Sequence, residues 1–84
     1  MSQNKSRVAV KIHGQEYVVR GEETAEYIET LAARIDRMMT QIGEKSTLQT
    51  GQIAVLTALN LADELEKLRQ KHAELLKMVR EGRN

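Results

Sequence analysis

Apolar residues occupy every second position from Val8 to Ile12, near the start of the chain. Strict alternation of this kind is typical of a half-buried β-strand. A short connection that contains Gly14 follows, and then a second β-rich run, Tyr17–Arg20. The pattern predicts a β-hairpin over residues 7–20.

The turn determines which residues of the hairpin face each other. If Gly14 and Gln15 form a two-residue type II′ loop, Ile12 faces Tyr17. Apolar side chains then meet on one face, and the other face is wetter. Because an isolated hairpin is only marginally stable, it must pack on helices or pair with another copy.

The apolar period changes to about 3.6 residues after the hairpin, which indicates an amphipathic helix over residues 24–42. Gly43 is expected to be its C-cap. The core-facing residues of this helix are Ile28, Leu31, Ala32, Ile35, Met38, Met39 and Ile42. Its opposite side carries Glu26, Glu29, Arg34, Arg37 and Gln41. We expect Met38 and Met39 to fill the core rather than to form an adaptable binding surface.

A second helix is predicted over residues 49–68, with the Ser and Thr residues of the segment 45–50 available as N-caps. Its first part, residues 53–62, is apolar nearly all round, apart from Thr57 and Asn60. Such a segment should be surrounded by protein. A hairpin and one helix cover only two of its sides, so a second copy of the chain is expected to cover the rest.

A heptad seam continues this helix, with apolar residues and one histidine at steps of three and four residues. The seam consists of Leu61, Leu65, Leu68, His72, Leu75 and Val79. In this register Glu64 lies at g and Arg69 at e, the positions that pair between the chains of a parallel coiled coil. We therefore expect a coiled-coil extension over residues 69–84, with a frayed C-terminus.

The predicted fold class is α+β: an N-terminal β-hairpin followed by two α-helices, the second long and ending in a short coiled coil, in a dimer. The expected organisation is a disordered leader (1–6), a domain (7–68) and the coiled-coil extension (69–84). A chain of 84 residues builds only a small core, so association is expected to supplement it. The predicted dimer interface consists of Leu56, Leu59, Asn60, Leu61, Leu65, Leu68 and Leu75.

Asn60 is a lone amide in an apolar run. An unpaired buried amide would cost about 1 to 3 kcal/mol, so Asn60 is expected to hydrogen-bond within or between chains. A buried asparagine can fix the register or the oligomeric state of paired helices. The alternative is that Asn60 simply faces solvent.

Composition argues against catalysis and bound cofactors. The chain has no cysteine, and its two histidines, His13 and His72, have no second set of ligands nearby to hold a metal. It also has no phosphate-binding glycine loop. With 13 basic and 12 acidic residues, the net charge of +1 gives no large field to attract nucleic acid or membrane phosphates. No apolar run follows the N-terminus, so neither secretion nor membrane insertion is expected.

Three segments of the sequence resemble the ZapA family. They are Ile-His-Gly-Gln-Glu-Tyr at residues 12–17, Tyr27-Ile28 with Ala-Ala-Arg-Ile-Asp at residues 32–36, and the run from Ile53 to Leu65. The last contains Ala-Leu-Asn-Leu-Ala-Asp-Glu-Leu at residues 58–65, which is similar to the family's Ala-Leu-Asn-Ile-Ala-Asp-Glu-Leu. The resemblance covers about residues 7–68 and is to the short form of the family.

The resemblance implies a non-enzymatic, cytoplasmic protein at the mid-cell division site. It would form a homodimer, and in some members a tetramer, bind FtsZ, and cross-link or bundle FtsZ filaments so that the Z-ring is stabilised. A symmetric dimer would supply the two equivalent faces that bundling needs.

Basic side chains are the candidate contacts to FtsZ, which is acidic as a family. Lys11 and Arg20 lie on the wetter face of the predicted hairpin, and Arg34 and Arg37 lie on the polar side of the first helix. These four residues form the predicted FtsZ contact.

Two other functions are consistent with parts of the pattern. A strand with outward Arg7 and Lys11 followed by two helices resembles the ribbon-helix-helix DNA-binding dimers. The second strand, the terminal seam and the near-neutral charge argue against DNA binding. The remaining alternative is a coiled-coil adaptor for another scaffold.

Overall fold

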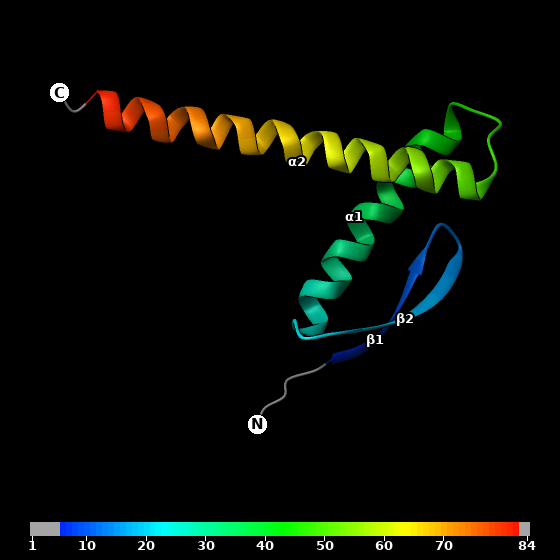
Figure 1. Cartoon of the computed structure of the whole chain (residues 1–84). Helices are drawn as coiled ribbons and strands as arrows, with labels where there is room; N and C mark the ends of the chain where they lie inside the picture. The colour runs from blue at the N-terminus through cyan, green and yellow to red at the C-terminus, as the bar shows by residue number, and fades with distance from the viewer. Residues whose placement is uncertain (1–5, 83–84) are drawn as a thin grey trace.

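The computed structural model describes residues 6–82 of the chain. Its elements follow the order β1 (Ser6–Ile12), β2 (Gln15–Gly21), α1 (Ala25–Glu44) and α2 (Thr50–Glu81) (Figure 1). The predicted fold, a hairpin followed by two helices of which the second is long, is confirmed. Residues 1–5 of the predicted leader lie outside the described residues, whereas Ser6 belongs to β1.

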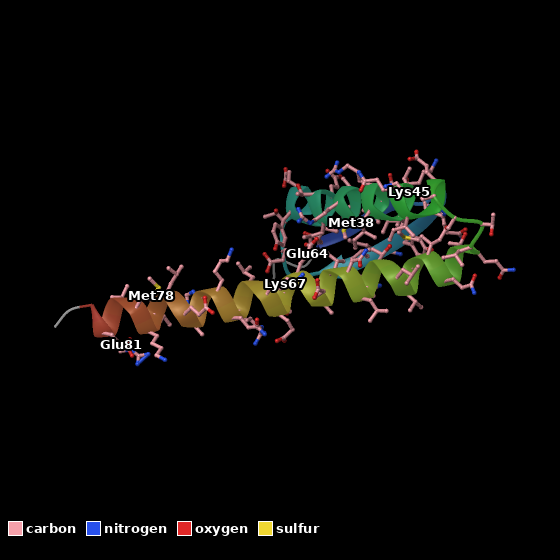
Figure 2. The ribbon with its side chains drawn as sticks, turned by 90° about the horizontal axis from the view of Figure 1, so that it is seen from above. Met38, Lys45, Glu64, Lys67, Met78 and Glu81 are labelled. Carbon is pink, nitrogen blue, oxygen red and sulfur yellow. The ribbon has the colours of Figure 1, made fainter. Side chains whose placement is uncertain are left out.

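The molecule is flat and open, with extents of 54 × 45 × 14 Å. Helix α1 packs against β1 and, at its C-terminal end, against the start of α2. Figure 2 shows the part of α2 from Lys67 to Glu81 extending beyond the rest of the molecule. Nearly half of the longest element, 15 of its 32 residues, therefore has no neighbouring element within the protomer.

Strands β1 and β2 pair in an antiparallel register that differs from the predicted one. Val10 pairs with Tyr17, and Ile12 pairs with Gln15, so the predicted facing of Ile12 and Tyr17 is wrong. The loop consists of His13 and Gly14, with φ angles of 53° and 80°. Positive φ at both central residues is the requirement of a type I′ turn, not of the type II′ turn that was predicted. The pairing shifts by two residues, which leaves every side chain on its predicted face.

A carboxylate of α1 holds the turn in place. The backbone N–H of His13 donates a hydrogen bond to Oδ1 of Asp36, at 2.6 Å. A left-handed conformation is uncommon for a residue with a side chain, although histidine adopts it more often than most. The bond to Asp36 stabilises this conformation and fastens the tip of the hairpin to α1.

The core between the hairpin and α1 is small. Val8 and Val10 from β1 and Ile28 and Ala32 from α1 are buried against one another. Each of the four is still 7% exposed, and no described residue has a fully buried large side chain. The predicted core residue Leu31 is 43% exposed, so it lies outside this core.

Helix α1 begins after Thr24, whose Oγ1 accepts a hydrogen bond from the N–H of Tyr27 at 3.1 Å. The predicted end at Gly43 is wrong, since the helix continues to Glu44 and Lys45 is its C-cap. Instead, Gly43 lies where α1 packs closely against two other parts of the chain. A Cβ atom there would lie 3.3 Å from Cδ1 of Ile53 and 3.6 Å from Cε1 of His13. The missing side chain thus lets α2 and the hairpin turn approach α1.

Helix α2 begins with a capping box rather than with the predicted Ser or Thr cap. The N–H of Gln49 donates to Oε1 of Gln52 at 3.0 Å, and the side chain of Gln49 accepts from the backbone of Gln52 in return. The helix then runs unbroken to Glu81, across the predicted boundary between residues 68 and 69. Of the end that was predicted to fray, residues 80–81 are helical, and residues 83–84 lie outside the described part of the chain.

Candidate partner-binding surfaces

Helix α2 covers little of its apolar surface within the protomer. Only Ile53 and Thr57 are buried, and the Thr57 hydroxyl donates to the carbonyl oxygen of Ile53 at 2.9 Å. The large apolar residues of this helix that stay exposed are Val55, Leu56, Leu59, Leu65, Leu68, Leu75, Leu76, Met78 and Val79. Leu68 and Val79 are each 65% exposed. An apolar surface of this extent on a small protein marks an interaction site.

The predicted interface residues lie on this surface. Leu61 is half-buried, and the other predicted leucines, from Leu56 to Leu75, are exposed. Asn60 is also exposed in the protomer, next to Leu59 and Leu61 along the helix. The protomer therefore leaves these residues uncovered, as a surface that another protein chain can cover.

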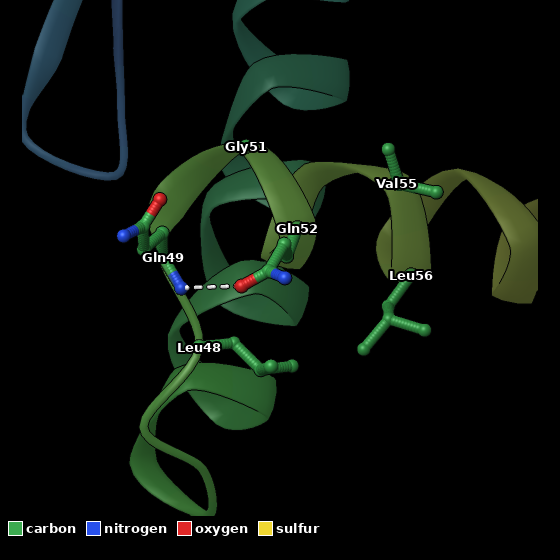
Figure 3. Close-up of a pocket in the computed structure, with 6 residues that line it drawn as sticks. All are labelled: Leu48, Gln49, Gly51, Gln52, Val55 and Leu56. Atoms are coloured by element: carbon green, nitrogen blue, oxygen red, sulfur yellow. Dashed lines mark hydrogen bonds between the residues drawn. The ribbon is translucent and has the colours of Figure 1, made fainter.

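An apolar hollow of 530 Å³ lies at the start of α2. Figure 3 shows the residues that line it, which are Leu48, Gln49, Gly51, Gln52, Val55 and Leu56. Leu48 is 37% exposed and Val55 is 60% exposed. The hollow extends the exposed apolar surface of α2 to its N-terminal end. No local pattern in the sequence predicts this hollow, because Leu48 lies in the connection before the helix.

The four predicted FtsZ-contact residues are exposed, and they lie on two elements. Lys11 and Arg20 are on the face of the hairpin that is turned away from α1. Lys11 alternates along β1 with the buried Val8 and Val10, and Arg20 pairs with Arg7, which alternates with them too. Lys11 pairs across the strands with Glu16, and Arg20 pairs with Arg7. Two like charges therefore lie opposite each other at the open end of the hairpin.

Arg34 and Arg37 lie on α1 beside α2. The guanidinium of Arg34 is 3.7 Å from the carboxylate of Glu64, with both side chains more than half exposed. A shallow hollow of 270 Å³ is lined here by Arg34, Arg37, Met38, Gln41 and Glu64. Glu64, predicted to pair with Arg69 of another chain, has a partner within its own protomer. Arg34 and Glu64 are far apart in the sequence, so no local sequence pattern predicts this ion pair.

Among residues 6–82, no group of three or more His, Cys, Asp or Glu side chains is placed to hold a metal ion. No helix in this range is both long and apolar enough to cross a membrane.

A family model described as "Cell division protein ZapA" matches residues 8–82. The Cell division protein ZapA of Bacillus mycoides (strain KBAB4) is 41% identical over 73 residues, which cover 86% of this chain and 82% of the relative. The protein of the same name from Geobacillus sp. (strain WCH70) is 38% identical over 78 residues, which cover 92% and 90%.

A solved structure has the same fold. It is described as a ZapA mutant dimer from Geobacillus stearothermophilus, and it aligns with a TM-score of 0.74 at 36% identity. The alignment covers 94% of this chain and 93% of the solved chain.

Proposed function

This chain belongs to the ZapA family of cell division proteins, which are associated with the Z-ring, and from that membership we propose that it binds FtsZ and cross-links its filaments. It acts in this proposal as a scaffold at the division site, in the cytoplasm at mid-cell, without catalysing a reaction. The observation that carries the proposal is the uncovered apolar surface of α2, because cross-linking needs a protein that joins two binding faces.

Dimerisation through α2 supplies those two faces. A symmetric dimer presents every surface of the protomer twice, so a filament-binding surface on one protomer is repeated on its partner. Two linked binding events also strengthen attachment without any new contact. The proposed interface is the predicted set, Leu56, Leu59, Asn60, Leu61, Leu65, Leu68 and Leu75. Residues 7–68 form the proposed family domain, and residues 69–84 extend its coiled coil.

The basic residues remain the proposed contacts to FtsZ. Lys11 and Arg20 on the hairpin and Arg34 and Arg37 on α1 are exposed, and they lie off the core. The ion pair of Arg34 with Glu64 does not prevent this role. An exposed pair at 3.7 Å contributes between about 0 and 1 kcal/mol, so Arg34 can exchange it for a carboxylate on a filament.

Co-sedimentation with polymerised FtsZ tests the proposal. Reversing Lys11 and Arg20 to Glu, or Arg34 and Arg37 to Glu, should lower the amount of protein that sediments with the filaments and reduce light scattering by bundles. Added salt should weaken the wild-type interaction, since exposed charges are screened.

The control reverses Lys67 and Lys77 to Glu, at heptad positions c and f, which point away from the seam. This variant has the same change in charge, and we expect it to bundle filaments like the wild type. If both test variants also bundle like the wild type at low salt, the assignment of these residues is wrong. If the wild type itself does not sediment with FtsZ, the proposed function is wrong.

A further inference from the structure

The sheet of this protein has an open edge at β2. In the part of the chain that the structure describes, β1 and β2 form a two-stranded sheet, so each strand pairs along one edge only. Strand β2 also leaves large apolar side chains uncovered: Val18 is 59% exposed and Tyr17 is 48% exposed. An open strand edge is a template for pairing with another strand.

The register determines which backbone groups this edge offers. The pair that flanks a two-residue hairpin loop exchanges hydrogen bonds, and so does every second pair after it. Here the flanking pair is Ile12 with Gln15. Alternate residues of β2, beginning with Gln15, therefore direct their N–H and C=O groups toward β1. The residues that direct these groups toward the open edge are Glu16, Val18 and Arg20.

These three residues are self-complementary about Val18. When two copies of β2 lie antiparallel with Val18 opposite the partner's Val18, Glu16 faces the partner's Arg20 and Arg20 faces the partner's Glu16. Opposite charges that face each other across strands are favourable, and like charges are not. On the other face of the sheet, Tyr17 then lies opposite the partner's Val19, so apolar side chains also meet.

The other open edge does not have this property. The residues of β1 that direct backbone groups outward are Arg7, Ala9 and Lys11. An antiparallel pair of β1 strands about Ala9 would place Arg7 opposite the partner's Lys11, and both are cationic. Pairing β1 with β2 of another copy in the register of the hairpin would place Arg7 opposite the partner's Arg20. Only the pairing of two β2 strands joins unlike charges at both ends.

We propose that the open edge of β2 is a contact surface for a second copy of this chain, which joins the two hairpins into a four-stranded antiparallel sheet centred on Val18. The contact is isologous, and it closes because the outer edges of the new sheet are the two mutually repulsive β1 strands. It also places the partner's Glu16 beside Arg20, where the hairpin alone has only the like charge of Arg7. The inference concerns contact between copies and stands apart from filament binding.

Cross-linking tests this contact in the full-length chain. The protein has no cysteine, so a single Val18→Cys substitution introduces the only thiol. Directly opposite residues of a hydrogen-bonded pair have Cα atoms about 5.5 Å apart, within the range of about 4.4 to 6.8 Å that a disulfide spans. We expect V18C to form covalent dimers on mild oxidation, and Ala9→Cys, on the same face but on β1, to form at least tenfold fewer. Equal yields from the two variants would overturn the proposal.

A charge swap tests the register. In the V18C background, Glu16→Arg places two arginines opposite each other at both ends of the contact, and the yield of cross-linked dimer should fall about tenfold. Adding Arg20→Glu restores unlike pairs in the reverse order, so the yield should recover. Circular dichroism of each variant checks that the fold is retained.

Failure of the swap to restore the yield, in a folded protein, would overturn the assigned register. The same swap separates this contact from filament binding. If Arg20 acts only on the filament, adding Arg20→Glu lowers co-sedimentation and leaves the yield of cross-linked dimer unchanged, and the proposal is then wrong.

Discussion

Single residues join the three parts of this small fold. Asp36 of α1 accepts a hydrogen bond from the turn residue His13, and the absence of a side chain at Gly43 allows both that turn and α2 to lie close to α1. Since the core of the hairpin and α1 is small, such contacts supply a large share of the stability of the protomer.

Asp36→Ala should lower the free energy of unfolding by about 1 to 2 kcal/mol, because a hydrogen bond to a charged acceptor is lost and the N–H of His13 is left without it. Chemical denaturation at a fixed protein concentration measures this change. The matched control is Asp63→Ala, which removes an exposed carboxylate 3.0 Å from Lys67 and should cost about 0.5 kcal/mol or less. Equal losses from the two variants would show that the bond to His13 contributes little.

Gly14→Ala should destabilise the protein by about 1 kcal/mol, since Gly14 has a φ angle of 80° that alanine adopts only with strain. Gly51→Ala is the matched control, because a Cβ atom meets nothing within 4 Å at either position. Gly51 lies in the first turn of α2, where alanine should be neutral or stabilising by up to about 1 kcal/mol. In thermal melts, Gly14→Ala should lower the Tm, whereas Gly51→Ala should leave the Tm unchanged or raise it. Equal changes in the Tm of the two variants would contradict the assigned turn.

At the scale of elements, α2 depends on partners outside the protomer. The helix has 32 residues, and the two that it buries within the chain, Ile53 and Thr57, lie in its first turns. Most of the stability of a helix in a protein comes from packing of its apolar face. The C-terminal part of α2 therefore needs a partner along the leucine seam.

Leu65→Glu should dissociate the dimer. Leu65 occupies an a position of the seam and is 49% exposed in the protomer. Burying two glutamates there against apolar neighbours would cost several kcal/mol of association free energy. Analytical ultracentrifugation should find monomer, folded or unfolded, where the wild type is dimeric. The control is Gln70→Glu, which adds the same negative charge at an f position and should leave the dimer intact. If the Leu65→Glu variant remains dimeric, the leucine seam is not the dimer interface.

At the scale of the whole molecule, we expect folding and association to be coupled. The flat, open protomer buries little apolar surface, so a second copy is expected to complete the core. The Tm should then depend on protein concentration, as expected when a partner binds only the folded state. A tenfold higher concentration should raise the Tm by a few degrees. The Leu65→Glu variant should lose this dependence, and a wild-type Tm that does not change with concentration would show that the protomer is stable alone.

The sequence by itself determined the elements and their faces. Period-two alternation in residues 7–12 and the 3.6-residue period after Gly21 predicted the hairpin and the helices, because side-chain burial imposes those periods. The leucine seam of α2 is also visible in the sequence pattern, and most of its residues are exposed in the protomer. The three matched segments predicted the family.

Only the tertiary structure decided where the turn and the helix ends lie. Sequence favours glycine at a position of positive φ, but His13 adopts one as well because Asp36, distant in sequence, binds its N–H. Gly43 looks like a helix C-cap, yet it lies inside α1, where Ile53 packs close to it. The pairing register of β2, and with it the charges along its open edge, follows from that turn. Contacts between distant residues fix these features, and no local pattern encodes such contacts.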